Sequence, residues 1–450
     1  MRRSRRWRLS RSLLALVLLA VVACGNENKR LGADSDGSTA SYVSRFGVDT
    51  SKCQDELVDG HLGTIVPIGT TMPLSGGPAK AFAPLAAGLE AYVAYANERG
   101  LLGDHTLQLT VEDDQLNPQL TRPAVLKLIE FNRVALLTGM VGTESNLAMR
   151  ELLNKECYPQ LFANSASPAL GDVERSPWTS GGVAPANTET AMYVHDMQAR
   201  FPHGATVALF GVNRELGSSY ASALERLAAG AKLQVVDEQT IDSGESGPPT
   251  AQVTSIAAKR PDVILAAPLG DQCPTFLTAI GRARAADASW QPRIYLTSSC
   301  ASAALLGRAG GDADGVITAT ALKDVNDPAL ANDAAVKDLR GALVGTGFPP
   351  DGDFATAAVG WTQMEATVEV LINAAASSGG LTRASIINAA RDLTFTPSLA
   401  RAGVSFVTIG AADPFVLESL QLVRFDATRG GYSEVGPLVT EFEGKSERSP

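Results

Sequence analysis

The sequence predicts an α/β fold built from two successive doubly wound lobes joined by a hinge, and three observations lead to this prediction. Short apolar runs alternate with helical segments, and the alternation starts a second time near residue 206. Strands that alternate with helices predict βαβ units and a parallel sheet. About 400 residues lie outside the polar termini, more than one core usually holds, so two lobes are expected.

The elements follow from local pattern: apolar runs predict strands, and apolar residues three and four apart predict helices. In the first half the strands are 65–72, 107–111, 134–137 and 160–163, and the helices are 79–99, 119–131 and 145–155. In the second half the strands are 206–210, 233–236, 262–267 and 293–297, and the helices are 218–229, 251–259 and 274–286. Helices at 332–344, 354–375 and 383–391 and strands at 420–425 and 432–435 complete the chain.

The N-terminus has the composition of an export signal. Six arginines within residues 2–11 precede an apolar run at 13–23, the order of a charged n-region and an h-region. The run is too short to cross about 30 Å of hydrocarbon as a helix. Residues 1–23 are therefore predicted to be a cleaved signal peptide. The sequence Ser4-Arg5-Arg6 also hints at twin-arginine export, although Arg8 stands where such signals have an apolar residue.

Residues 21–24, Val-Val-Ala-Cys, resemble the lipobox of bacterial lipoproteins, in which the cysteine is acylated and becomes the mature N-terminus. The resemblance implies that Cys24 carries a lipid that anchors the exported chain at the outer or periplasmic face of the cell membrane. The alternative is ordinary secretory cleavage, with Cys24 left as a thiol. Residues 24–52 and 441–450 are small and polar, and are predicted to be a flexible tether and a disordered tail.

The charge balance argues against a polyanionic partner. Removal of the six arginines of residues 1–23 reduces the 38 Lys and Arg residues to 32 against 48 Asp and Glu, a formal net charge of −16. Nucleic-acid binding depends on basic side chains that neutralise phosphates, and no basic stripe with interleaved aromatic residues follows Arg11. No nucleic-acid partner is expected, and the lipid is the only expected membrane contact.

No catalytic or metal-binding constellation is found in the sequence. There is no G-x-S-x-G, C-x-x-C, G-x-x-x-x-G-K-[ST] or G-x-G-x-x-G pattern, hence no nucleophile elbow, thiol pair or phosphate-binding loop. His195 and His203, eight residues apart around a helix end, are more typical of a solvated face than of a metal site. The carboxylate triplet 112–114 closes a strand, where a structural role is expected. Neither enzymatic activity nor a cofactor is expected.

Six motifs resemble the leucine/isoleucine/valine-binding-protein-like solute receptors of ABC importers, which have the type I periplasmic-binding fold. They lie at 69–77, 94–103, 111–118, 137–145, 164–170 and 354–361. Each motif is short, but their order and spacing extend the resemblance from residue 62 to residue 435. The resemblance implies a two-lobed clamshell that binds a small solute and delivers it to an ABC permease in the membrane.

The resemblance also implies which residues hold the ligand. In open α/β sheets ligands lie beyond the carboxyl ends of the strands, where helix N-termini leave backbone N–H groups free. Family members use a hydroxyl residue in the 142–145 turn to hold a ligand carboxylate, and Thr143 stands at that place. Thr143 and Ser145 also fit the role of a helix N-cap. The implied ligand-binding residues are Phe82, Thr143, Ser165, Ala166, Leu216, Asp271, Gln272 and Ser299.

The second lobe departs from the family pattern. Leu216 stands where branched-chain receptors have an aromatic residue, and Gln272 replaces another aromatic residue. Ser299 replaces the acidic residue that pairs with an ammonium group, and Asp271 is the candidate substitute. The family therefore indicates an amino acid or a similar small polar metabolite without identifying it.

Four cysteines follow Cys24, an even number that favours two disulfides in an exported protein. Cys273 and Cys300 follow two strands that are expected to be neighbours, so both lie at one carboxyl edge within bridging range. Cys53 and Cys157 precede strands and belong to the opposite edge. The predicted pairs are Cys273–Cys300 and Cys53–Cys157, and the alternative is four buried small hydrophobic residues.

The expected lobes are 62–185 with 322–413 and 186–318 with 418–440, joined by hinge crossovers near 183–187, 318–324 and 411–418. The expected function is that of a lipid-anchored substrate-binding protein of an ABC importer. A ligand-sensing lipoprotein that signals to a membrane receptor would use the same clamshell, and neighbouring permease and ATPase genes would distinguish the two. Turnover of a bound metabolite would reveal an enzyme that lacks a recognised motif.

Overall fold

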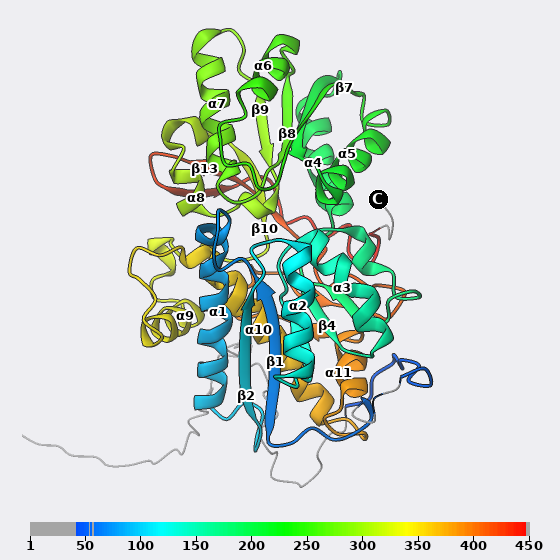
Figure 1. Cartoon of the computed structure of the whole chain (residues 1–450). Helices are drawn as coiled ribbons and strands as arrows, with labels where there is room; N and C mark the ends of the chain where they lie inside the picture. Colours follow the sequence, from blue (N-terminus) through cyan, green and yellow to red (C-terminus); the bar gives the residue numbers. More distant parts are fainter. Residues whose placement is uncertain (1–41, 54, 56–57, 447–450) are drawn as a thin grey trace, which may run out of the picture. The chain divides into compact units, whose positions relative to one another are not determined.

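The computed structural model describes residues 42–53, 55 and 58–446, which form two lobes, each built on one mixed or parallel sheet covered by helices (Figure 1). The predicted signal peptide and Cys24 lie outside the described residues. In the part of the chain that the structure describes, no helix is long and apolar enough to cross a membrane.

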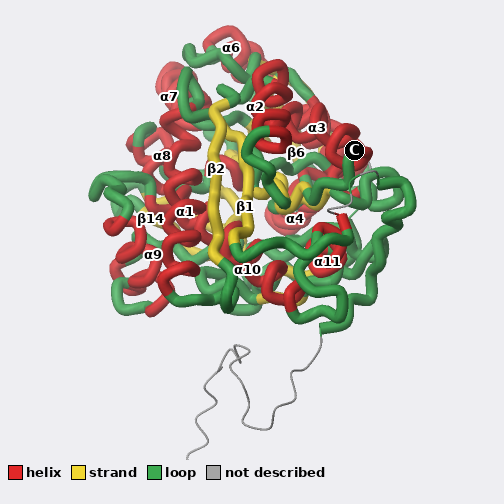
Figure 2. Tube along the Cα trace, turned by 60° about the horizontal axis from the view of Figure 1, so that its bottom comes forward, coloured by secondary structure: helices red, strands yellow, loops and turns green. Residues whose placement is uncertain are grey.

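The first sheet is parallel throughout, with strand order β2-β1-β3-β4-β5. Its strands are β1 (Ile65–Met72), β2 (Thr106–Asp113), β3 (Leu136–Thr138), β4 (Gln160–Ala163) and β5 (Thr179–Gly181), and its helices are α1 (Ala79–Glu98), α2 (Pro118–Glu130) and α3 (Thr143–Lys155). Figure 2 shows β1 and β2 side by side. Val66, Ile68 and Met72 of β1 are fully buried, because helices cover both faces of the sheet at this strand.

The second sheet has the order β14-β13-β10-β9-β8-β6-β7, in which β13 and β14 form an antiparallel edge on five parallel strands. Its strands are β6 (Ala205–Val212), β7 (Leu233–Ile241), β8 (Val263–Ala267), β9 (Arg293–Leu296), β10 (Ile317–Thr320), β13 (Gln421–Asp426) and β14 (Gly431–Glu434). Its helices are α4 (Ala186–Arg200), α5 (Glu215–Ala228), α6 (Thr250–Lys259), α7 (Gln272–Ala286) and α8 (Ala303–Gly307).

Helices from the C-terminal half return to the first lobe. They are α9 (Ala334–Gly345), α10 (Phe354–Ala375) and α11 (Arg383–Ala390), followed by the hairpin β11 (Thr394–Phe395) and β12 (Phe406–Val407). The backbones of α1 and α10 touch, since a Cβ at Gly88 would lie 1.9 Å from the Ala357 carbonyl oxygen and one at Gly360 would lie 2.0 Å from that of Leu85. The chain therefore passes between the lobes three times, after β5, after β10 and before β13.

Most of the predicted elements are confirmed, and β1, β4 and α10 have the predicted ends. Strand β7 continues to Ile241, five residues past the predicted end. The sequence prediction omits α4 and β10. Helix α4 is buried along much of its length and therefore shows no two-faced pattern, and β10, with the sequence Ile-Thr-Ala-Thr, has no continuous apolar run.

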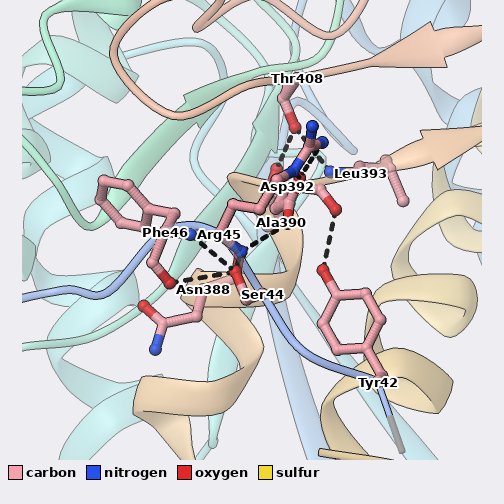
Figure 3. A network of polar contacts seen from close by, with 9 residues as sticks. All are labelled: Tyr42, Ser44, Arg45, Phe46, Asn388, Ala390, Asp392, Leu393 and Thr408. Atoms are coloured by element: carbon pink, nitrogen blue, oxygen red, sulfur yellow. Dashed lines mark hydrogen bonds and ion pairs between the residues drawn. The ribbon is translucent and has the colours of Figure 1, made fainter.

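The predicted tether is wrong for its last part, because residues 42–48 contact α11 and the residues directly after it (Figure 3). The Tyr42 hydroxyl donates to the Asp392 carbonyl oxygen at 2.8 Å, and the Ser44 hydroxyl donates to that of Asn388 at 2.9 Å. Arg45 forms an ion pair with Asp392 and also donates its backbone N–H to that carboxylate at 2.6 Å. These contacts fasten the start of the described chain to the first lobe.

Both predicted disulfides are confirmed. Cys53 and Cys157 have Cα atoms 5.7 Å apart, and those of Cys273 and Cys300 are 5.9 Å apart. The first disulfide attaches the N-terminal segment just beyond the C-terminal end of α3. The second joins the start of α7 to the loop after β9.

Candidate functional site: a cavity between the two lobes

A cavity of about 650 Å³ lies at the carboxyl ends of both sheets. Its first-lobe lining includes residues that follow each of β1 to β5 and residues of α10, and its second-lobe lining includes residues that follow β6, β7, β8 and β9. Residues 319–324, which leave β10 toward the first lobe, also contribute. The volume is within the range of small-molecule sites, roughly 300–1,000 Å³.

The first-lobe wall presents hydroxyl groups. Thr143 and Ser165 line the cavity, and their Oγ atoms lie 2.9 Å apart. Ser165 is held in place by the backbone N–H of Ser167, which donates to its Oγ at 3.2 Å. Ala166 and Phe82 line the cavity beside them. The structure thus brings the four sequence-predicted residues of this lobe to one wall.

The first turn of α3 has no side-chain cap. The N-cap residue is Gly142, whose φ of 101° is one that side chains disfavour, and a Cβ there would lie 2.7 Å from Leu116 Cδ1. Thr143 is the first helical residue, and the Ser145 hydroxyl lies 2.7 Å from that of Thr121. Neither residue is therefore the N-cap. The N–H groups of this turn remain available to an anion in the cavity.

The second-lobe wall is supported from behind by a carboxylate. Glu189 of α4 is fully buried, and its Oε1 accepts the Ser298 backbone N–H at 2.5 Å while its Oε2 accepts the Tyr220 hydroxyl at 2.6 Å. The Tyr193 hydroxyl also donates to Oε1, at 2.6 Å. Burial raises the pKa of Glu189. Tyr220 and Ser298 both line the cavity, so Glu189 determines how this wall is positioned.

Leu216 and Ser299, two predicted residues of the second lobe, also line the cavity. The Ser299 hydroxyl is engaged within its own lobe, 2.9 Å from Thr297 Oγ1 and 3.4 Å from the Pro268 carbonyl oxygen. The neighbouring residue, Cys300, is fully buried in its disulfide with Cys273. This wall presents apolar surface, hydroxyl groups that already have partners, and the guanidinium group of Arg214.

The structure places Asp271 and Gln272 outside the cavity lining. Asp271 forms an ion pair with Arg308 at 2.6 Å, and Arg308 lowers the pKa of this carboxyl. Gln272 is buried, and its Nε2 donates to the carbonyl oxygens of Asp242 and Glu245 at 2.8 and 2.9 Å. Both side chains have partners within the second lobe, which the strand-end position alone does not reveal.

Polar contacts join the lobes beside the cavity, and one of them is the ion pair of Arg401 with Glu434 of β14 at 2.8 Å. The Ser167 hydroxyl of the first lobe donates to Glu215 Oε1 at 2.6 Å, and the Ser302 hydroxyl of the second lobe donates to Asp353 Oδ2 at 2.5 Å. Burial raises the pKa of Glu215. These contacts describe lobes that are closed on the cavity.

Sequence reasoning missed several lining residues. The positions of Tyr220 and Ser298 depend on their hydrogen bonds to Glu189, which is far from both in sequence. Arg214 and Glu144 follow strand ends as closely as the predicted residues do, and that position is the signal that could have found them. Arg214 supplies a guanidinium group and Glu144 a carboxylate, so both charges reach the cavity.

The acidic triplet 112–114 is structural, as expected. Glu112 pairs with Lys127 at 2.8 Å, and Asp113 accepts the backbone N–H of Leu74 at 2.9 Å. Asp114 accepts the Thr121 hydroxyl at 2.8 Å. These bonds shape the loops after β1 and β2.

Two α/β lobes thus direct their strand ends at one shared cavity, which is large enough to enclose a small solute. The model of the periplasmic binding protein family matches residues 65–428. The chain therefore belongs to this family, with the type I fold of the leucine/isoleucine/valine-binding-type receptors of ABC transporters, as the resemblance predicted. The family consists of solute-binding receptors, not enzymes.

Several solved structures share the fold at low identity. A branched chain amino acid ABC transporter protein from Thermus thermophilus with bound valine has a TM-score of 0.74 at 18% identity, over 84% of this chain and 97% of that one. A possible leucine/isoleucine/valine-binding protein from Rhodopirellula baltica has a TM-score of 0.66 at 20% identity, over 84% and 97%. A solute binding protein from Rhodopseudomonas palustris in complex with benzoate has a TM-score of 0.68 at 18% identity, over 84% and 99%. No curated protein sequence matches the chain.

Proposed function

We propose that this receptor captures an amino acid or a related small carboxylate between its lobes and delivers it to an ABC permease. The observation that carries the proposal is the first-lobe wall, where two buried hydroxyl groups adjoin the uncapped N-terminus of α3. Backbone N–H groups and the helix dipole favour an anion at such a place. Hydroxyl donors would complete the coordination of a carboxylate.

The second wall would select the remainder of the solute. Its lining groups Leu216, Tyr220 and Ser299 offer apolar surface and engaged hydroxyls, and Asp271 is paired with Arg308. Ser299 stands at the position where branched-chain receptors have the acid that pairs with the ammonium group. Valine and benzoate, the ligands bound in two of the solved structures, both carry a carboxylate. A carboxylate is the one feature of these ligands that we propose for the solute of this chain.

We infer that Cys24 carries the membrane anchor, since the Val-Val-Ala-Cys ending precedes a polar stretch that leads to the first lobe. Replacement of Cys24 by alanine should move the protein from the membrane to the soluble fraction. Retention of the variant in the membrane, with no incorporation of labelled palmitate into the wild type, would contradict the lipoprotein assignment.

A thermal-shift screen tests the proposed ligand class. Amino acids, their amides, aromatic acids and short aliphatic carboxylates are added separately to the purified protein. Ligand at about 100 times its Kd adds about 2.7 kcal/mol to the unfolding free energy, so at least one carboxylate should raise the melting temperature by several degrees. A response only to uncharged solutes would reject the carboxylate proposal and leave the family assignment intact.

A further inference from the structure

Three carboxylates converge at the last passage of the chain between the lobes. Asp413 and Glu418 belong to the stretch that leads from β12 to β13, and Glu443 belongs to the C-terminal segment. The two stretches are adjacent, because Leu420 and Val439 form an antiparallel bridge. One oxygen atom from each carboxylate lies within 4.8 Å of the other two.

The three groups are shielded from water. Asp413 is 5% exposed and Glu418 is 0% exposed. Asp413 Oδ1 and Glu443 Oε1 are buried and have no hydrogen-bond partner. An orphaned, buried carboxylate oxygen is costly, so its presence in a native fold calls for a ligand or a proton.

The donors around the cluster orient it without neutralising it. Glu418 accepts the backbone N–H groups of Gly444 and Ser446 at 2.6 and 3.0 Å, and Glu443 Oε2 accepts the Ser419 hydroxyl at 2.8 Å. All three donors are uncharged. The bonds of Glu418 hold residues 444–446 against the stretch of chain that passes between the lobes. The sequence predicts these residues to be part of a disordered tail, so this prediction is wrong for them.

No cationic side chain among residues 42–53, 55 and 58–446 forms an ion pair with these carboxylates. Arg391 is adjacent to this stretch, but it gives its donors to carbonyl oxygens, including that of Pro414 at 3.4 Å and that of Ser176 at 3.3 Å. Among the described residues, the donors to Glu418 and Glu443 are therefore uncharged groups, and Asp413 Oδ1 has no donor.

We propose that Asp413, Glu418 and Glu443 form a binding site for a hard divalent cation, with Ca²⁺ as the fitting ion. Ca²⁺ binds carboxylate oxygens at about 2.3–2.6 Å, so ligands on one ion lie no more than about 5 Å apart, as these do. The set contains only oxygen ligands, whereas Zn²⁺ sites favour His and Cys. The ion would fasten the C-terminal segment to the passage between the lobes and would satisfy both orphaned oxygens.

Calorimetric titration of the EDTA-treated, full-length protein with CaCl₂ tests the site. We expect one bound ion per chain, weaker binding of MgCl₂, and a rise in melting temperature with Ca²⁺. Asp413→Asn and Glu443→Gln should each weaken Ca²⁺ binding by at least about ten-fold. Glu441→Gln is the matched control, because this neighbouring carboxylate pairs with His195 at 2.6 Å and lies outside the cluster; its Ca²⁺ affinity should equal that of the wild type.

The variants also separate binding from folding. In EDTA, Asp413→Asn removes one of three mutually repelling charges and should melt at or above the wild-type temperature, while its Ca²⁺-dependent rise is lost. The proposal is overturned if the wild type shows neither heat nor a melting shift with millimolar Ca²⁺, or if both cluster variants bind Ca²⁺ as tightly as Glu441→Gln does.

Discussion

The two walls of the cavity are built in opposite ways. The first-lobe wall has an uncapped helix terminus and hydroxyl groups that adjoin the cavity. The second-lobe wall has its polar groups bonded to Glu189, to Pro268 and to one another, with a disulfide directly behind it. The first wall therefore offers uncapped N–H groups and hydroxyls beside Glu144, whereas the second offers apolar surface, engaged hydroxyls and the guanidinium group of Arg214. Experiments that change one wall should affect binding and stability differently from those that change the other.

The two disulfides offer the largest expected effects and the clearest contrast. In the chain-entropy model the 104-residue separation of Cys53–Cys157 corresponds to about 4.7 kcal/mol and the 27-residue separation of Cys273–Cys300 to about 3.5 kcal/mol. Double alanine variants should lose roughly these amounts in denaturant unfolding. Only the Cys273–Cys300 variant should also bind the solute more weakly, because only that disulfide adjoins the cavity. Equal affinity losses in both variants would remove the distinction between the walls.

Glu189→Ala should have the next largest effect. The change leaves the Tyr220 hydroxyl and the Ser298 N–H without a partner in the interior, at a cost of about 2–4 kcal/mol in unfolding free energy. Glu189→Gln, which keeps an acceptor oxygen, should lose less. An unfolding midpoint for Glu189→Ala equal to that of the wild type would show that the wall does not depend on this carboxylate.

The pH dependence of the unfolding free energy is a second test of the contribution of Glu189. Burial raises its folded-state pKa, so the native protein binds this proton more tightly than the unfolded chain does. Its contribution to stability is present below the ordinary glutamate pKa and is lost as the pH rises through the raised folded-state value. Chemical unfolding across this interval should show a smaller decline in Glu189→Gln than in the wild type.

Thr143→Ala tests the first wall and should change affinity more than stability. Loss of the hydroxyl leaves part of the ligand charge unpaired and should cost about 1–3 kcal/mol of binding. Thr143→Ser, which keeps the hydroxyl, is the control and should retain most of the affinity. Identical titration curves for Thr143→Ala and the wild type would place the carboxylate elsewhere.

Asp271→Asn should have the smallest effect. Its ion pair with Arg308 is partly exposed, and pairs of this kind contribute about 0–1 kcal/mol to stability. Solute affinity should stay within about two-fold of the wild type, because the side chain does not line the cavity. A loss as large as that of Thr143→Ala would restore the sequence-based assignment of Asp271 to the site.

The first wall could be predicted from the sequence because its groups are local. The turn at 142–145 follows a strand and opens a helix, so the position of Thr143 indicates both its element and its surroundings. The second wall could not be predicted from the sequence, because Glu189 is 31 residues from Tyr220 and 109 residues from Ser298. A buried acid within a helix has no pattern that identifies its partners.

In the fold, too, features that depend on local sequence could be predicted, whereas features that depend on distant partners could not. Strands and helices with a regular apolar period, such as β1 and α10, were predicted to the residue. Residues 42–52 are predicted to be tether because they are polar, yet Arg45 and Tyr42 are fixed by Asp392, some 350 positions away. Polar segments held by distant partners require the tertiary structure.

The central claim, that the α3 terminus holds a ligand carboxylate, is tested most directly by one calorimetric comparison. A solute identified in the screen is titrated into the wild-type protein as the acid and as its primary amide, which has nearly the same shape without the charge. We expect the amide to bind at least about ten-fold more weakly, the equivalent of 1.4 kcal/mol. Equal affinities for acid and amide would show that the first wall does not recognise charge and would contradict the proposed carboxylate site.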